Sequence, residues 1–315
     1  MKPISILTTL LSSLLSLEFT QGFALNPHSF IVGGSVAQEA EFPFMARVLV
    51  KNLSSCGGFI LSKKWIGTAA HCVVNQETLA LTSPNLLQII VGTNDNTVTS
   101  SKIKKVVKVV IAPGYSIDKQ EDDLALLELD EELIFDERIQ PIAISTAKVS
   151  EKQTFTAAGW GLIEDGTPSA RLMQVDLITA SLTKCRQVVP GFKNNNGPQI
   201  CTDAETGKDT CPGDSGGPLF RSEQNGFSLY GITSYSAYPQ GASTTCGGSD
   251  TIVGVYTHVG YYVSFISSTM GLSQQELTNP HDTVINEGVD TSNAATHSPK
   301  SYVAILSALI ILLSV

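Results

Sequence analysis

Short runs of β-branched and aromatic residues recur along the middle of the chain, separated by turn-forming residues. We interpret as strands the runs at residues 45–50, 87–92, 103–111, 124–129, 153–159, 172–178, 218–220 and 228–234. Breaks rich in Asn, Gly and Pro separate several of them. Short strands with regular turn signals are typical of all-β sandwiches and barrel pairs. Residues 259–270 instead carry apolar side chains at helical spacing, which predicts one amphipathic helix.

The two ends of the chain depart from this pattern. Residues 1–24 hold a lysine, an apolar run and small residues before Leu25, which predicts a secretory signal peptide; a buried first helix is the alternative. Residues 271–300 are polar, which indicates a linker. Residues 301–315 form a hydrophobic tail, and the order of small residues, spacer and apolar end is that of a GPI-anchor signal. Asn293 is then the candidate attachment site, with a short membrane-inserted tail or an unprocessed soluble tail as alternatives.

Composition and charge exclude some classes of protein. The 315 residues are 42% hydrophobic, enough for a sizeable core, and the net charge of −9 argues against a nucleic-acid partner. The lysines of residues 102–108 alternate with Ile and Val, which is typical of the solvated face of a strand. We find no motif for a metal or a cofactor. An exported chain permits disulfides, but six cysteines allow about 15 pairings. Asn52 begins the one N-glycosylation sequon.

Three segments carry residues suited to nucleophilic catalysis. They contain His71 beside Cys72, Asp123 before an apolar strand, and Ser215 inside a Gly-Asp-Ser-Gly-Gly sequence. A serine hydroxyl is a poor nucleophile at neutral pH and needs an adjacent base, for which a histidine is suited. A buried carboxylate orients the imidazole and stabilises its charged form. Glycines around the serine allow backbone N–H groups to face a developing oxyanion.

These segments resemble the trypsin/chymotrypsin-like serine endopeptidases, in that family's order of His, Asp and Ser. Ile31-Val32-Gly33-Gly34 resembles the family's mature amino terminus, and Gly159-Trp160-Gly161 resembles a loop near its active site. The resemblance covers residues 31–270. It implies an all-β fold of two packed six-stranded Greek-key β-barrels with a C-terminal α-helix.

The resemblance also assigns roles to single residues. Ser215 would be the nucleophile, His71 the general base and then acid, and Asp123 the orienting carboxylate, with Asp122 as the competing acid. The backbone N–H groups of Gly213 and Ser215 would form the oxyanion hole. The family pattern pairs the cysteines as Cys56–Cys72, Cys185–Cys201 and Cys211–Cys246.

Activation in this family frees an amine that pairs with the acid preceding the nucleophile. Here these would be Ile31 and Asp214, and residues 25–30 would be a short propeptide. The residue before the cleavage point is Phe30, where the family commonly has Arg or Lys. We therefore expect an activator that prefers aromatic or bulky residues.

The primary specificity pocket would be built around Asp209, which selects Arg or Lys by pairing with the cation. Its walls would be Ser234, Tyr235, Ser236 and Gly254. Ser236 stands where a glycine is usual, and residues 237–245 form a longer loop than in compact family members. Both departures weaken the expected preference for Arg and Lys.

Taken together, the sequence predicts a secreted serine endopeptidase that cleaves after Arg or Lys, needs no cofactor or metal, and acts as a monomer. Its partners would be protein or peptide substrates and protease inhibitors, with membrane attachment only through a GPI anchor. Two alternatives stay open. One is the same chemistry with another primary preference, and the other is a catalytically silent binding protein on the same scaffold.

Overall fold

The computed structural model describes residues 33–51, 53–97, 103–163, 166–204, 208–242 and 251–281. The expected signal peptide, propeptide and hydrophobic tail lie outside these ranges, and so does most of the expected linker. Also outside them are Phe30, Ile31, Asn52, Cys246 and Asn293.

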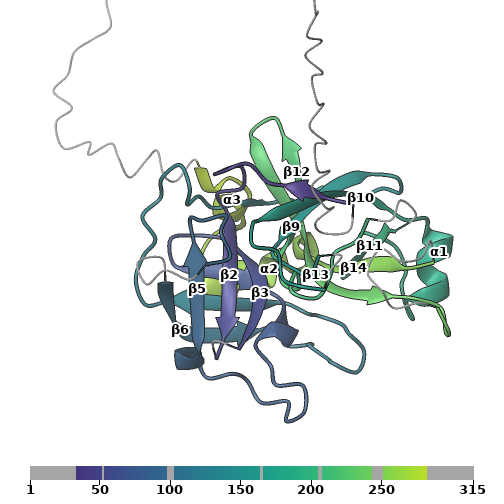
Figure 1. Ribbon diagram of the computed structural model, residues 1–315, viewed down its shortest axis with the longest axis horizontal. Coiled ribbons are helices and arrows are strands. Elements are labelled where there is room, and N and C mark those ends of the chain that lie inside the picture. The colour runs from purple at the N-terminus through teal and green to yellow at the C-terminus, as the bar shows by residue number, and fades with distance from the viewer. Residues whose placement is uncertain are drawn as a thin grey trace, which may run out of the picture.

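The first half of the described chain forms a closed barrel whose strands follow the order β2-β3-β4-β7-β6-β5 (Figure 1). All neighbouring strands are antiparallel. Most residues of β2, β4, β5 and β7 are buried, and their apolar side chains form the core of the barrel. The strands are β2 (Met45–Val50), β3 (Ser54–Ile60), β4 (Trp65–Thr68), β5 (Leu87–Val91), β6 (Ile103–Ile111) and β7 (Ala125–Leu129).

The second half, together with β1 from the start of the described chain, forms an eight-stranded sheet that also closes on itself. Its order is β1-β10-β11-β14-β13-β12-β9, and β9 pairs again with β10 to complete the ring, while β8 pairs with β13. The strands are β1 (Ser35–Val36), β8 (Ala143–Ile144), β9 (Thr154–Gly159), β10 (Met173–Thr179), β11 (Gln199–Asp203), β12 (Pro218–Glu223), β13 (Gly226–Ala237) and β14 (Val253–His258). Two barrel-like sheets therefore confirm the expected fold class.

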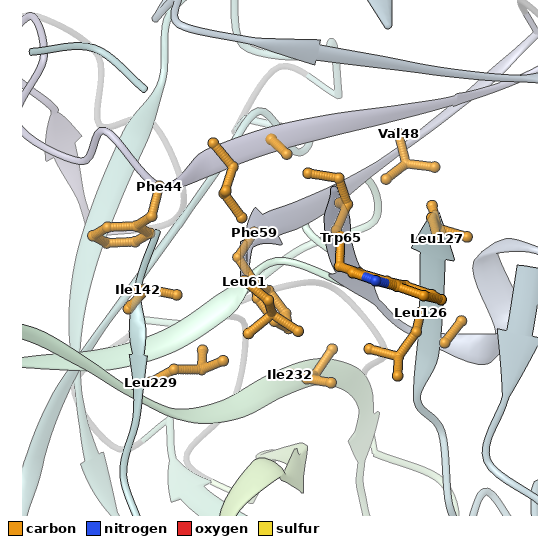
Figure 2. Packing of buried hydrophobic residues seen from close by; sticks show 14 of the residues in the cluster. Phe44, Val48, Phe59, Leu61, Trp65, Leu126, Leu127, Ile142, Leu229 and Ile232 are labelled. Carbon is orange, nitrogen blue, oxygen red and sulfur yellow. The ribbon is translucent and has the colours of Figure 1, made fainter. Parts of the chain in front are cut away.

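Aromatic residues join the two barrels. The rings of Phe42 and Phe44, which precede β2, lie 4.9 and 5.0 Å from the ring of Phe220 in β12. Figure 2 shows Phe44, Phe59 and Leu61 on one side and Leu229 and Ile232 on the other side of this continuous core. Burial of such side chains contributes about 1.5–3 kcal/mol each, so the two barrels stabilise each other.

Short helices and 3-10 turns connect or follow the strands. The predicted helix over residues 259–270 is a 3-10 turn, η4 (Val259–Tyr262), continued by α2 (Val263–Met270). Gly271 follows in a left-handed conformation and ends α2. A further helix, α1 (Leu182–Val188), carries Cys185. Short 3-10 turns also form at η1 (Ala70–Cys72) and η2 (Pro84–Leu86).

The start of the expected linker differs from the prediction. Residues 274–278 form a short helix, α3 (Gln274–Thr278), which begins with a capping box between Ser273 and Glu276. Leu277 is 1% exposed and belongs to the main core cluster. One buried leucine and a capped first turn thus extend the folded body beyond residue 270.

Candidate active site

His71 and Asp123 meet on the first barrel, facing the second. His71 lies in the turn η1 after β4, and Asp123 lies shortly before β7, the strand that pairs with β4. His71 Nδ1 is 2.7 Å from Asp123 Oδ2, and the backbone N–H of His71 donates to Asp123 Oδ1 at 2.9 Å. Two contacts from one residue fix both oxygens of the carboxylate, so the imidazole has one orientation.

Asp123 is 3% exposed but is held in its charged form. Burial alone would raise the pKa of Asp123, yet hydrogen bonds from His71 and Ser234 and the nearby imidazole outweigh it, and the pKa is lowered. Ser234 Oγ donates to Asp123 Oδ2 at 2.5 Å from β13 of the second barrel. Thr257 in β14 donates to the backbone carbonyl of Asp123 at 3.0 Å. The second barrel thus helps to hold the acid of the first.

The neighbouring carboxylate, Asp122, points elsewhere. It accepts a hydrogen bond from the hydroxyl of Tyr262. Its backbone has φ of +54°, in the left-handed region that non-glycine residues rarely adopt. This turn directs the two consecutive aspartates to different partners, and only Asp123 contacts His71.

Ser215 lies in the loop before β12, packed against the first barrel. Its carbonyl accepts from the N–H of Gly57 in β3 at 2.8 Å. Cys72 Sγ lies 3.7 Å from that carbonyl and 3.8 Å from His71 Nε2, so the serine and the imidazole flank the same sulfur. Gly216 follows with φ of +79°, and a Cβ there would be 2.2 Å from Thr68 Oγ1. The sequence Ser-Gly therefore allows the loop to approach the first barrel closely.

The N–H groups of Gly213 and Ser215 have no acceptor among the described residues, although those of Asp214, Gly216 and Gly217 all donate. Gly213 has φ of +100°, a conformation that glycine allows. Two neighbouring backbone donors without protein acceptors are the arrangement that binds an oxyanion.

Asp209 lies six residues before Ser215 in the chain and is 1% exposed. The N–H of Thr210 donates to Asp209 Oδ1 at 2.8 Å, and Ser236 Oγ lies 3.5 Å from Asp209 Oδ2. Burial raises the pKa of Asp209 to about 7. Ser236 and Gly254 are direct cross-strand partners in β13 and β14, and Tyr235 pairs with Val255. The residues expected at the specificity pocket therefore lie together.

Asp214 is also buried, at 1% exposure. Gly161 N–H donates to its Oδ1 at 2.8 Å and Cys211 N–H to its Oδ2 at 2.9 Å. Burial raises the pKa of Asp214 to about 6. In the described part of the chain its hydrogen-bond donors are these two neutral N–H groups, and its expected partner Ile31 lies outside that part.

Two disulfides brace this region. Cys56 is bonded to Cys72 and Cys185 to Cys201, two of the three pairs implied by the family resemblance. Cys211 is buried, and Cys246, its expected partner, lies outside the described residues. Cys56, His71 and Cys72 are the one described group with metal-ligand spacing, but both sulfurs are in the disulfide and offer no thiolate.

The sequence predicts His71, Asp123 and Ser215, but it does not predict the residues that form hydrogen bonds to the two aspartates. Tyr262 and Thr257 carry no motif, and Ser234 was expected only as a pocket wall. Ser234 and Asp123 are 111 residues apart in the chain, and Tyr262 and Asp122 are 140 apart. No local pattern signals contacts of such separation.

Comparisons with known proteins identify the family to which the chain is similar. Residues 31–266 match a family model described as Trypsin. The venom peptide isomerase heavy chain of Agelenopsis aperta is 30% identical over 256 residues, which cover 76% of this chain and 100% of that protein. The serine protease SP24D of Anopheles gambiae is 29% identical, over 76% of this chain and 81% of its own length. The transmembrane protease serine 11G of Mus musculus is 29% identical over 81% of this chain, a match that spans 59% of the mouse protein.

Proposed function

Since the chain belongs to the trypsin family of serine proteases, we propose that it is an active, secreted endopeptidase that cleaves peptide bonds after Arg or Lys. The observation that carries the proposal is the pairing of His71 with a buried, ionised Asp123, beside a serine loop with two N–H groups that have no acceptor among the described residues.

In the proposed mechanism, Ser215 Oγ attacks the scissile carbonyl and His71 Nε2 accepts the hydroxyl proton. Asp123 holds Nδ1 of the imidazole, which leaves Nε2 as the free base, and it stabilises the imidazolium that forms. His71 then protonates the leaving amine, and an acyl-enzyme on Ser215 remains. Water attacks this ester with His71 again acting as base, and the serine is regenerated.

The backbone N–H groups of Gly213 and Ser215 would bind the oxygen that gains negative charge in both steps. Loss of one such donor typically costs about 2.7–4 kcal/mol of transition-state stabilisation. The positive φ of Gly213 supports this role because a side chain at that position would strain the turn.

Preference for Arg or Lys rests on Asp209. A buried carboxylate with no cation at hand among the described residues carries a desolvation penalty that a substrate guanidinium or ammonium would relieve. Ser236 shares the pocket and lies within 3.5 Å of the carboxylate, so its hydroxyl narrows the space for a long side chain. We expect this hydroxyl to modulate the choice between Arg and Lys.

Activation would follow cleavage after Phe30. The new amine of Ile31 would pair with Asp214, whose carboxylate is buried and has only neutral donors among the described residues. An enzyme specific for Arg and Lys could not cleave efficiently after Phe30, so the activator would be a different protease.

Location is proposed from the sequence of the chain ends. The signal peptide would direct export, Asn52 would carry a glycan, and the tail would be exchanged for a GPI anchor at Asn293. Within the described residues, no helix is both long and apolar enough to cross a membrane. Release of the protein from cells by a phosphatidylinositol-specific phospholipase would support the anchor, and retention would refute it.

The test of the proposal uses protein that begins at Ile31, assayed on matched peptides with Arg, Lys, Phe or Ala before the scissile bond. Cleavage after Arg and Lys, lost in Ser215→Ala, is the expected result. Cleavage after Phe would keep the mechanism and overturn the specificity. If Ser215→Ala retained full activity, the catalytic assignment would be wrong. No cleavage of any peptide would favour the silent binding protein.

A further inference from the structure

Arg47 lies in β2 and lines a cavity of about 400 Å³ that adjoins the candidate oxyanion hole. The proposed reaction does not use this arginine. The cavity is bounded by four groups of residues, from β2 with the turn into β3 and its start, from the segment after β5, from the loop around Trp160, and from the loop that carries the nucleophile. These residues are Arg47, Leu49, Leu53, Ser54, Ser55, Asn96, Trp160, Leu162, Pro168, Pro212 and Gly213.

Arg47 has no carboxylate partner among the described residues. Its Nε donates to Ser55 Oγ at 2.9 Å, and one terminal nitrogen donates to the carbonyl of Asn96 at 2.6 Å. A guanidinium has five N–H donors, so most of its donors stay available. The side chain is half-buried, and burial lowers the pKa of Arg47. A half-buried guanidinium with available donors would be stabilised by a carboxylate that enters the cavity.

The cavity's lining shows which part of a substrate would reach it. The side chain before the scissile bond would occupy the pocket of Asp209, along residues 234–236 of β13. None of these residues lines the Arg47 cavity, which instead contacts Gly213, Pro212 and the start of β3. Gly57, two residues after Ser55 of this lining, donates its N–H to the carbonyl of Ser215. The cavity therefore lies on the side of the leaving group.

We propose that the Arg47 cavity is a substrate subsite that binds the carboxylate of an Asp or Glu among the first three residues after the scissile bond. Arg47 would donate to the carboxylate, with Ser54 and Ser55 as further polar neighbours and Trp160 and Leu162 packed along the stem. The inference rests on the proposed endopeptidase function and names a second determinant of its substrates.

The kinetic test compares peptides that carry Glu or Gln at the first, second or third position after the scissile bond. We expect kcat/KM to be about tenfold higher for Glu than for Gln at one of these positions, from a charge-assisted hydrogen bond. Arg47→Gln should reduce this Glu/Gln ratio to about one, and Arg47→Lys should retain part of it. Because both kcat/KM values are measured on the same enzyme sample, their ratio does not change if part of the protein is unfolded.

The matched control is Arg221→Gln, which changes an arginine on β12 that lies over the ring of Phe155 and does not line the cavity. This variant should keep the wild-type ratio. Ratios near one at all three positions of the wild-type enzyme would overturn the inference, and so would a high ratio that persists in Arg47→Gln. In either case cleavage of the Gln peptides would leave the proposed function intact.

A binding test is independent of turnover. Peptides that begin with the residue after the scissile bond, with Glu or Gln at the selected position, are titrated into Ser215→Ala protein. Trp160 lines the cavity, so its fluorescence should report occupancy, and Trp160→Phe should remove that signal. About tenfold tighter binding of the Glu peptide, lost in Arg47→Gln, supports the subsite even if no peptide is cleaved. Equal affinity for both peptides overturns it.

Discussion

Replacement of Asp209 by Asn should stabilise the protein at alkaline pH and leave its stability unchanged at acid pH. Asn can keep both contacts of the native carboxylate. Its Oδ1 accepts from the N–H of Thr210, and its Nδ2 donates to Ser236 Oγ, whose hydroxyl can act as acceptor. The substitution therefore removes a buried charge without removing hydrogen bonds.

The size of the effect follows from the pKa of Asp209, raised from 3.8 to about 7 by burial. Below pH 3.8 the carboxyl is protonated in both folded and unfolded protein and contributes no pH dependence. Between pH 3.8 and about 7 the unfolded chain releases the proton first, so stability falls as pH rises. Above about pH 7 the full penalty is present and amounts to about 4 kcal/mol as an upper limit.

The assay is urea unfolding with and without the Asp209→Asn substitution, both in a Ser215→Ala background that prevents self-digestion. We expect Asp209→Asn to gain about 2–4 kcal/mol at pH 8 and less than about 0.5 kcal/mol at pH 4. Asp214 is present in both proteins, and its charge helps to raise the pKa of Asp209, so the difference also includes the repulsion between these two carboxylates. An equal gain at both pH values, or a loss at pH 8, would refute the assignment of Asp209 as a buried carboxylate without a cationic partner in the described fold.

Three further predictions test the supports of the site. Gly216→Ala should destabilise the fold by about 3 kcal/mol or more, because its Cβ would lie 2.2 Å from Thr68 Oγ1 and 2.6 Å from the Gly57 carbonyl oxygen. The control is Gly241→Ala, which has a similar φ of +84° but open space around its Cβ and should cost only about 1 kcal/mol. Thermal unfolding of both variants measures the two costs. Leu277→Ala should cost about 2–3 kcal/mol in urea unfolding and Gln274→Ala almost nothing, and equal costs would show that α3 is not part of the core. Ser234→Ala should raise the pKa of Asp123 and reduce kcat/KM about two- to tenfold, and a steady-state assay that finds no change would show that the 2.5 Å contact is dispensable.

Strands with runs of β-branched and other apolar residues could be predicted from the sequence, and strands held by pairing alone could not. The pattern predicts β2 and β6 with the bounds that the structure gives. It misses β3, whose residues Ser54 to Gly58 are small and whose central glycines have low strand propensity. β3 forms because it pairs along its length with β2 and lies beneath the loop of Ser215. Tertiary contacts overrode local preference there.

The helix α3, which the sequence analysis does not predict, does have a local signal in the sequence. Ser273 and Glu276 have the spacing of a capping box, which is visible in the sequence and would have predicted a helix start. The polar composition of residues 271–300 concealed this signal. A single apolar residue, Leu277, then anchors the helix, and one residue has no periodicity to detect.

The candidate site shows the same division between motif and environment. His71, Asp123 and Ser215 stand in short motifs, so their identity could be predicted. Their electrostatics could not be, because Asp123 depends on Ser234 in the other barrel. Arg47 had no motif at all, and its importance appears only from the cavity and from the absence of a described acid beside it.

The buried charges of the site fall into two classes, and the difference supports the proposed function. Asp123 has its partners within the fold, because His71 and Ser234 both contact its carboxylate, and its pKa is lowered. Asp209 and Asp214 have no cationic partner among the described residues, and burial raises the pKa of both. In the proposed function each of these two receives a cation from outside the described fold: Asp209 from a substrate side chain and Asp214 from a newly formed amine.

Arg47 is the same case with the opposite sign, because a half-buried cation without a described acid beside it favours a ligand that carries a carboxylate. Unpaired charge, which lowers stability in the free protein, is therefore placed where a specific partner would bind.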